Sequence, residues 1–331
     1  MNTVLVTGAT GLTGSNVCKL LTLRGDQVRA LVRPSADGQP LADLGVELVA
    51  GDVTDAHSVE LAAKGCDAAI HCAALLGGAS QDLADFEAVN TTGTTNVLDA
   101  AAAVGMRRVV ALSTGTFFDT TTGAAPEDAP VAAQPSSDPY TVTKLAAFLE
   151  AMSRAAAGQD VVTCHPGAIY GPAPVESRAL ARTSFNRVLL AALRGRIDRY
   201  LRFPVTWVFA EDVARGSIAA LDHGVSGERY MLDGRPEDVM SIAEACNRAC
   251  TLAGLSYRVD DIEPSDDPEL AKAFGPTLVS IASKPRSDPR LRPTESKTAR
   301  RLGYVPTSLD AGLGELIDWL LAIGRLEGST T

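Results

Sequence analysis

The sequence predicts an α/β fold with a doubly wound parallel sheet and a smaller C-terminal lobe. Strands alternate with helices through the first half of the chain, a glycine-rich turn joins the first strand to the first helix, and the alternation breaks after Pro172. Strands separated by helices form right-handed βαβ units, which place the strands parallel with helices on both faces. With 331 residues, 46% of them hydrophobic and 21% charged, the chain can bury such a core.

The individual elements follow from short apolar runs and from helical periodicity. Strands are expected at residues 3–7, 27–32, 46–49, 67–72, 108–113 and 160–165, and helices at 12–24, 55–64, 82–104, 139–157, 294–302 and 308–323. Asp55 is the expected N-cap of its helix. Residues 1–172 then form the main domain, to which 205–235 return, and residues 173–204 and 236–331 form mainly the smaller lobe, which we expect to bind the substrate.

Charge and targeting signals restrict the class of protein. A net charge of −10 repels the phosphates of nucleic acids and of anionic lipids, so neither is an expected partner. The chain starts directly with a strand, and no apolar run reaches the roughly 18 residues that span a bilayer, so we expect a cytoplasmic protein. Six cysteines without a CxxC pair indicate reduced thiols, and no metal site is expected.

The segment TGATGLTG, residues 7–14, follows the first strand and opens a helix. Glycines let the backbone approach a pyrophosphate closely, and the N–H groups of a helix N-terminus attract the anion. The expected contacts are Gly8, Thr10, Gly11, Leu12 and Gly14. The spacing is GxxGxxG instead of the fingerprint GxGxxG, and an ordinary tight turn is the alternative. Its position after the first strand favours a Rossmann-type dinucleotide site.

The ends of the next strands indicate which cofactor would bind. The second strand ends in ALVRP, and Arg33 there would accommodate the 2′-phosphate of NADP, where an acidic residue would bind the 2′-hydroxyl of NAD. We expect NADP(H) to be preferred and NAD(H) to be possible; a solvated surface arginine is the alternative. Asp52, followed by Val53, would accept from the adenine amino group or belong to a helix-capping turn. Ala73 and Ala74 are small enough for the cofactor to lie against the backbone.

Tyr140 and Lys144 are four residues apart and share one face of an expected helix. A nearby ammonium stabilises a phenolate and lowers the pKa of the tyrosine, which can then act as general acid for ketone reduction and general base for alcohol oxidation. A surface tyrosine beside a solvated lysine is the weaker alternative, given the glycine motif upstream. A hydroxyl at the end of the fifth strand would hold the substrate oxygen, and both Ser113 and Thr114 qualify.

The ordered set of motifs resembles the extended short-chain dehydrogenase/reductase family, within the NAD-dependent epimerase/dehydratase superfamily, over nearly the whole chain. The matching segments are TGATGLTG (7–14), GDVTD (51–55), HCAA (71–74), VNTTGTTNVLDAA (89–101), RRVVALST (107–114), YTVTK (140–144), HPGAIYGP (165–172), FAEDVARGSIAAL (209–221) and LGYVPTSLDAGLGELIDWL (302–320). The sequence is most similar to the branch with dihydroflavonol reductases and 3β-hydroxysteroid dehydrogenases.

This resemblance implies roles for particular residues. Thr114 matches the catalytic hydroxyl, Tyr140 and Lys144 match the acid/base pair, and Asn90 matches an asparagine that supports the site. The residues expected to contact the nicotinamide carboxamide are Pro166, Gly167, Ala168 and Ile169. The long helices at 82–104 and 139–157 form the dimer interface in this family, so a homodimer is expected.

Two departures from the family pattern concern the substrate. His165 stands where an arginine is common, and Ala168 stands where nucleotide-sugar enzymes often carry an asparagine. We therefore expect an NADP(H)-dependent oxidoreductase acting on a carbonyl or secondary alcohol of a modestly apolar small molecule. The alternatives are a nucleotide-sugar epimerase or dehydratase with tightly bound NAD(P), and a non-catalytic NAD(P)-binding regulatory protein. The expected substrate-pocket segments are 75–87, 115–137, 173–205 and 254–293.

Overall fold

The computed structural model describes residues 2–77, 82–119, 127–269, 271–274, 279 and 296–327. Its centre is a seven-stranded sheet with the strand order β11-β6-β5-β4-β1-β2-β3. These strands are β1 (Thr3–Thr7), β2 (Gln27–Val32), β3 (Glu47–Ala50), β4 (Ala68–His71), β5 (Val109–Leu112), β6 (Val161–Pro166) and β11 (Arg229–Leu232). Each neighbouring pair is parallel, and the order reverses between β1 and β4. The doubly wound Rossmann-type sheet is thereby confirmed.

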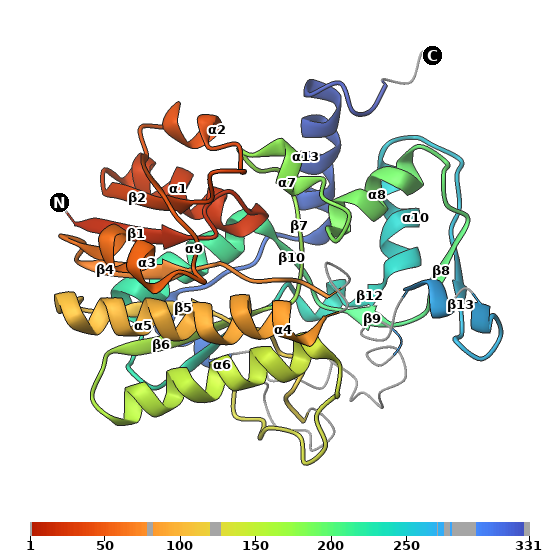
Figure 1. The fold of residues 1–331 in the computed structure, drawn as a ribbon. Helices are drawn as coiled ribbons and strands as arrows, with labels where there is room; N and C mark the ends of the chain where they lie inside the picture. Colours follow the sequence, from red (N-terminus) through yellow and green to blue (C-terminus); the bar gives the residue numbers. More distant parts are fainter. Residues whose placement is uncertain are drawn as a thin grey trace.

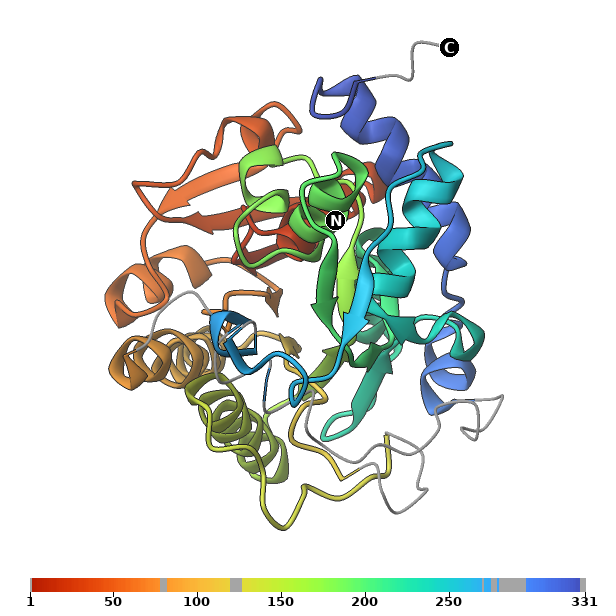
Figure 2. The same ribbon diagram turned by 90° about the vertical axis from the view of Figure 1, so that its right-hand side faces the viewer.

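Helices cover both faces of this sheet (Figure 1). On one face lie α1 (Leu12–Arg24) and α9 (Ala210–His223), and on the other lie α3 (Ala56–Ala63), α5 (Gly93–Val104) and α6 (Pro139–Ala156); the short α2 (Gln39–Ala42) precedes β3. Successive side chains of β1 alternate between the two hydrophobic cores: Val4 and Val6 pack with α1, whereas Leu5 packs with α3 and α5. Figure 2 shows α5 and α6 side by side, viewed along their axes.

The helix expected over residues 82–104 is present without a break from Leu83 to Val104, but it contains a π-helical turn that was not expected. The structure has α4 (Leu83–Phe86), the π-helical turn η1 (Glu87–Thr92) and then α5. Within η1, Asn90 and Thr91 direct their side chains to hydrogen bonds with α6. Apolar periodicity does not report such polar contacts, and π-helical turns of this kind occur most often near functional sites.

A second core forms the smaller lobe, which we define as the elements from β7 to β10, those from η2 to β13, and α13. Its strands pair as β7 (Ala168–Tyr170) with β10 (Trp207–Phe209), β8 (Arg199–Leu201) with β13 (Asp260–Ile262), and β9 (Pro204–Val205) with β12 (Met240–Ser241). Its helices are α7 (Glu176–Ala179), α8 (Phe185–Leu193), η2 (Pro236–Asp238), α10 (Ile242–Leu252) and α13 (Leu309–Ala322). Tyr170, Trp207, Leu190 and Leu316 are buried together there.

Late parts of the chain return to the main sheet. β11 pairs with β6, α9 packs on α1, and α12 (Lys297–Leu302) packs against α9 and β11. Parts of the segments 75–87, 115–137 and 254–293, which were expected to line the pocket, lie outside the described residues. Among the helices that the structure describes, none has both the length and the apolar character needed to cross a bilayer.

Candidate active site

The β1–α1 turn is shaped for an anion by its glycines. Gly8 has a φ of +65°, and a Cβ there would lie 2.5 Å from the Ala73 nitrogen; a Cβ on Gly14 would lie 2.3 Å from the Gly8 oxygen. Glycine alone therefore allows β1, α1 and the end of β4 to meet at the point where the strand order reverses. Gly11 caps α1 without any side-chain hydrogen bond, so N–H groups of the first helical turn are left for a ligand. These features fit a dinucleotide pyrophosphate.

The other residues expected at the cofactor border the same edge of the sheet. Thr10, Leu12, Ala73 and Ala74 are half-buried, while Arg33 directly follows β2 and is exposed. The guanidinium of Arg33 forms no ion pair with any residue that the structure describes.

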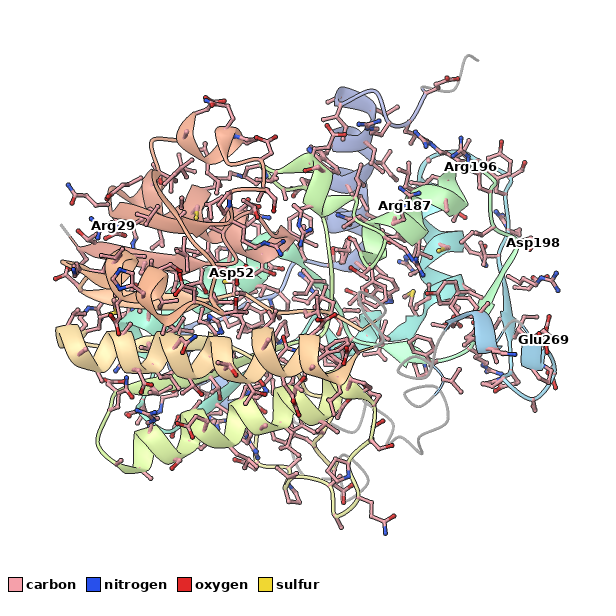
Figure 3. The ribbon with its side chains drawn as sticks, viewed as in Figure 1. Arg29, Asp52, Arg187, Arg196, Asp198 and Glu269 are labelled. Atoms are coloured by element: carbon pink, nitrogen blue, oxygen red, sulfur yellow. The ribbon has the colours of Figure 1, made fainter. Side chains whose placement is uncertain are left out.

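Asp52 and Asp55 have different hydrogen-bond partners at the start of α3. Asp55 caps α3 by accepting from the His57 backbone N–H at 3.1 Å. Asp52 accepts from the backbone N–H and the hydroxyl of Thr54, both at 3.0 Å, and lies beside the main sheet in Figure 3. The following Val53 is buried and packs against the position of Gly93. Asp52 thus forms a turn, and the helix cap belongs to Asp55.

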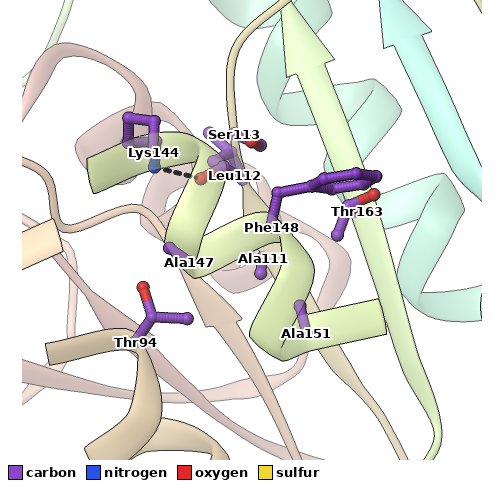
Figure 4. A pocket seen from close by; sticks show the side chains of 9 residues that line it. All are labelled: Thr94, Ala111, Leu112, Ser113, Lys144, Ala147, Phe148, Ala151 and Thr163. Atoms are coloured by element: carbon purple, nitrogen blue, oxygen red, sulfur yellow. Dashed lines mark hydrogen bonds between the residues drawn. The ribbon is translucent and has the colours of Figure 1, made fainter. Parts of the chain in front are cut away.

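The start of α6 brings Tyr140, Lys144 and Thr114 together. Asp138 caps this helix and Pro139 occupies its first turn, so Tyr140 is presented at the helix N-terminus. The Thr114 hydroxyl accepts from the Thr116 backbone N–H at 3.3 Å and lies close enough to Tyr140 to favour its phenolate. One turn further along α6, the buried Lys144 donates from Nζ to the Leu112 oxygen at 2.7 Å (Figure 4).

The surroundings shift the pKa values of this pair. Burial and, to a smaller extent, the Asp138 carboxylate raise the pKa of Tyr140, and the Thr114 hydroxyl works against them. Burial lowers the pKa of Lys144 to about 8, although the Cys72 thiol works in the opposite direction. In the chain by itself Lys144 is not among the causes that shift the pKa of Tyr140, because its ammonium is directed to a main-chain carbonyl; its stabilisation of the Tyr140 phenolate stays a prediction. Tyr140 is therefore a protonated acid near neutral pH.

The two candidate hydroxyls at the end of β5 have different partners. The Thr114 hydroxyl accepts from the Thr116 N–H at 3.3 Å and lies beside Tyr140, whereas the Ser113 Oγ is buried with no hydrogen-bond partner among the described residues. Ser113 instead faces a small cavity between α6 and the sheet (Figure 4). This cavity is lined by Thr94, Ala111, Leu112, Ser113, Lys144, Ala147, Phe148, Ala151 and Thr163.

Asn90 does not contact the Tyr140 side chain but connects the elements around it. Its Oδ1 accepts from the Leu75 N–H at 2.8 Å, and its Nδ2 donates to the Leu75 oxygen and to the Thr143 hydroxyl, each at 3.1 Å. Thr143 in turn donates to the Pro139 oxygen at 2.7 Å. Asn90 thus ties the segment after β4 to the first turn of α6, and it is a positioning residue.

The segment Pro166–Ile169 follows β6 and leads into the smaller lobe. A Cβ on Gly167 would lie 2.3 Å from the Thr206 oxygen, so this loop is pressed against the start of β10. The Thr206 hydroxyl donates to Asp233 at 2.8 Å, beside the end of β11. Sequence reasoning missed Thr206 and Asp233, because the β10–β7 pairing brings Thr206 to this loop and the β11–β6 pairing brings Asp233.

His71 and the cysteines are structural. His71 is buried with its ring nitrogens 2.6 Å from the Thr7 hydroxyl and 3.1 Å from the Thr94 hydroxyl, and burial lowers its pKa to about 3. All six cysteines are free. Within the described part of the chain, no group of three or more His, Cys, Asp or Glu residues could hold a metal ion.

Comparison with known proteins places these features in a family. Residues 4–232 match the NAD dependent epimerase/dehydratase family. Over 338 aligned residues the chain is 28% identical to "Sterol demethylase protein B" of Methylococcus capsulatus, covering 98% of this chain and 100% of that protein. It is 26% identical to a "Putative dihydroflavonol 4-reductase" of Synechocystis, covering 95% and 93% of the two chains. The solved structure of gox2253 superimposes with a TM-score of 0.83 at 26% identity, covering 99% of this chain and 100% of that one.

The family match spans the whole main sheet, from β1 to the end of β11. Within it lie the glycine cradle, Thr114 beside Tyr140, and the buried Lys144. The chain therefore belongs to the NAD-dependent epimerase/dehydratase family of extended short-chain dehydrogenases/reductases and is an NAD(P)-dependent oxidoreductase-type enzyme.

Proposed function

We propose that this enzyme is NADP(H)-dependent and transfers a hydride to or from a carbonyl or secondary alcohol carbon of a modestly apolar small molecule. The observation that carries this proposal is the placement of Thr114 beside Tyr140, with the buried Lys144 one turn along α6 at the carboxyl edge of the sheet. A bound nicotinamide dinucleotide supplies or accepts the hydride. The residues that would hold it are Gly8, Thr10, Gly11, Leu12, Gly14, Arg33, Asp52, Val53, Ala73, Ala74, Tyr140, Lys144, Pro166, Gly167, Ala168 and Ile169.

The side chains at the end of β5 and the start of α6 have different roles in the proposed reaction. The Thr114 hydroxyl donates to the substrate oxygen and holds it beside Tyr140. During reduction the electron pair of the C=O bond moves to that oxygen, which takes the Tyr140 proton; during oxidation Tyr140 takes the alcohol proton back. The Lys144 ammonium stabilises the phenolate that reduction leaves behind and holds the ribose. Asn90 keeps the start of α6 in place.

The names of the relatives support an apolar substrate. One relative over the full chain is named for a sterol and another for a dihydroflavonol. Ala168, which is buried and apolar, offers no hydrogen bond to a sugar diphosphate. A nucleotide-sugar epimerase or dehydratase would recycle its cofactor internally, and a non-catalytic protein would have no chemical need for the Thr114, Tyr140 and Lys144 set.

Nicotinamide absorbance tests this proposal. The purified enzyme is incubated with NADPH and sterol ketones, dihydroflavonols, ketones or aldehydes, and with NADP⁺ and the matching alcohols. We expect net change in absorbance with at least one of these apolar classes. Cofactor that co-purifies tightly and shows no net turnover, together with conversion of a nucleotide sugar, would contradict the proposal and indicate internal recycling.

Arg33 is the residue proposed to select NADP(H). Replacing Arg33 by alanine should raise the KM for NADPH about 10–100-fold, since hydrogen bonds to charged groups contribute about 1.5–3 kcal/mol. The KM for NADH should stay within a few-fold. The matched control is Arg196→Ala, because Arg196 is also exposed but lies on the smaller lobe (Figure 3). A wild-type enzyme that prefers NADH would remove Arg33 from this role.

We further propose a homodimer built on α4, α5 and α6. Val142 and Leu149 of α6 are 41% and 53% exposed, and Val104 of α5 is 38% exposed, so both helices present apolar side chains outward. We expect light scattering to show a dimer for the native chain and a monomer for Leu149→Glu. The control Leu23→Glu places the same charge on α1, where Leu23 is 73% exposed, and should remain dimeric. A native chain that is monomeric at working concentrations would contradict the dimer.

A further inference from the structure

His165 lies directly behind Thr114 and is fully buried. It belongs to β6, next to the point where the N–H of Ser113, the residue after β5, donates to the Cys164 oxygen at 2.7 Å. Aromatic rings surround the imidazole: the centroids of Phe118, Phe148 and Phe117 are 5.1, 5.4 and 6.1 Å from its own. An apolar side chain could fill this space equally well. A buried imidazole has two polar ring nitrogens, and each needs a hydrogen-bond partner to offset the cost of its burial.

Both nitrogens have partners, and these determine the tautomer. Nδ1 is 2.8 Å from the Thr114 carbonyl oxygen, and Nε2 is 3.0 Å from the Thr163 hydroxyl. A carbonyl oxygen can only accept, so Nδ1 carries the hydrogen. Nε2 of a neutral ring is then an acceptor, and the Thr163 hydroxyl donates to it. The result is a directed chain of hydrogen bonds from Thr163 through His165 to the main chain of Thr114.

The electrostatic surroundings keep this ring neutral. Burial lowers the pKa of His165 to about 3, and the hydrogen bond to Thr114 works in the opposite direction. The cations that face the ring come from three elements, with Arg229 on β11, Lys144 on α6 and Lys297 on α12, and each disfavours a second positive charge. Arg229 is itself held over the Phe118 ring, 4.3 Å from its centroid. The tautomer therefore persists across the physiological pH range.

We propose that His165, as the neutral Nδ1–H tautomer, is a positioning residue that holds the Thr114 backbone so that the Thr114 hydroxyl meets Tyr140. The inference rests on the proposed function, because it deepens the role of the same site. The Thr114 hydroxyl belongs to the same residue as the carbonyl that His165 binds. If that carbonyl moves, the catalytic hydroxyl therefore moves with it. Displacements of about 1 Å at a reacting group can cost about 100-fold in rate.

Three substitutions at His165 separate the hydrogen bond from packing. In His165→Asn, the side-chain Nδ2 stands near the position of Nδ1 and can donate to Thr114; in His165→Gln, the donor lies further out; in His165→Leu, it is lost. We expect kcat to fall a few-fold for Asn and about 10–100-fold for Gln and Leu, with the KM for NADPH unchanged. Equal losses for Asn and Leu, or wild-type kcat in Leu, would overturn the proposal.

Thr163 supplies a second test that preserves the ring. Thr163→Val removes the donor to Nε2 at nearly constant volume, and Thr163→Ser restores it. Long-range ¹H–¹⁵N spectra, assigned among the 4 histidines by the signals that vanish in His165→Asn, report the tautomer. We expect Nδ1–H without titration from about pH 5 to 8 in the native enzyme and in both variants, because the Thr114 carbonyl fixes the hydrogen on Nδ1; the ¹⁵N shift of the unprotonated Nε2 should move in Val and return in Ser.

A native Nε2–H tautomer, or titration within that range, would overturn the positioning role. The spectra need no substrate, so their outcome judges His165 independently of whether the proposed reaction is found. Loss of turnover in the panel assay together with a locked Nδ1–H tautomer would count against the proposed function and leave the hydrogen-bond chain in place. A changed tautomer with normal turnover would count against the positioning role.

Discussion

Tyr140→Phe is expected to lower kcat about 10²–10⁴-fold, the range for loss of a general acid–base group. The phenol ring and its place at the start of α6 are kept, so only the hydroxyl with its proton is removed. Steady-state rates with NADPH and the best carbonyl substrate measure the effect. The KM for NADPH should change little, because the glycine cradle and the loop after β6 are untouched.

Tyr257→Phe is the control for this substitution, since Tyr257 is 45% exposed and follows α10 in the smaller lobe. It should keep wild-type rates. If Tyr140→Phe also kept nearly full activity while remaining folded, Tyr140 would not be the proton donor, and another group near Thr114 would have to be sought.

Lys144→Met is expected to lower kcat about 10²–10³-fold, because the positive charge that stabilises the developing phenolate is lost. Methionine has nearly the same length as lysine and is apolar, so it fills the buried space that the Lys144 side chain occupies beneath α6. Rates measured at saturating NADPH and substrate separate this effect from weaker binding. Activity of the variant within a few-fold of wild type would show that the phenolate needs no ammonium.

The same variant should alter stability with a predictable sign. The folded pKa of Lys144 is lowered to about 8, so between pH 8 and the ordinary lysine value of 10.5 the unfolded chain holds a proton that the folded enzyme has released. Stability of the wild type relative to Lys144→Met therefore rises with pH over that window, by about 3 kcal/mol in total. Urea unfolding at pH 7 and pH 10 measures the change. A constant difference would show that Lys144 is not desolvated.

Much of the fold could be predicted because its signals are local. The bounds expected for α1 and β2 match Leu12–Arg24 and Gln27–Val32, where the glycine turn and the helix-ending Gly25 mark the ends. The expected bounds of β3, residues 46–49, are one residue too early. The observed strand Glu47–Ala50 has few buried side chains, so its apolar pattern defines its ends poorly. The π-helical turn around Asn90 depends on tertiary hydrogen bonds, and no sequence period encodes them.

The candidate site was predictable only as far as chain order and strand ends determine it. The motifs placed Tyr140, Lys144 and the Ser113–Thr114 pair at one sheet edge, but alternation along β5 could not choose between the two hydroxyls. The proximity of Tyr140 favours Thr114, whereas Ser113 faces the cavity beneath α6. His165 was noted only as a departure from a common arginine, because its contacts with Thr114 and Thr163 depend on the pairing of β5 with β6.

Transfer of deuterium is the most direct test of the central claim. NADPH carrying deuterium at the transferred C4 position is incubated with the enzyme and a ketone found in the absorbance panel, and the product is examined by mass spectrometry. Net hydride transfer with proton donation by Tyr140 predicts one carbon-bound deuterium per alcohol formed, at a rate strongly reduced in Tyr140→Phe. Alcohol without deuterium, or a product isomerised while the cofactor returns unchanged, would contradict it.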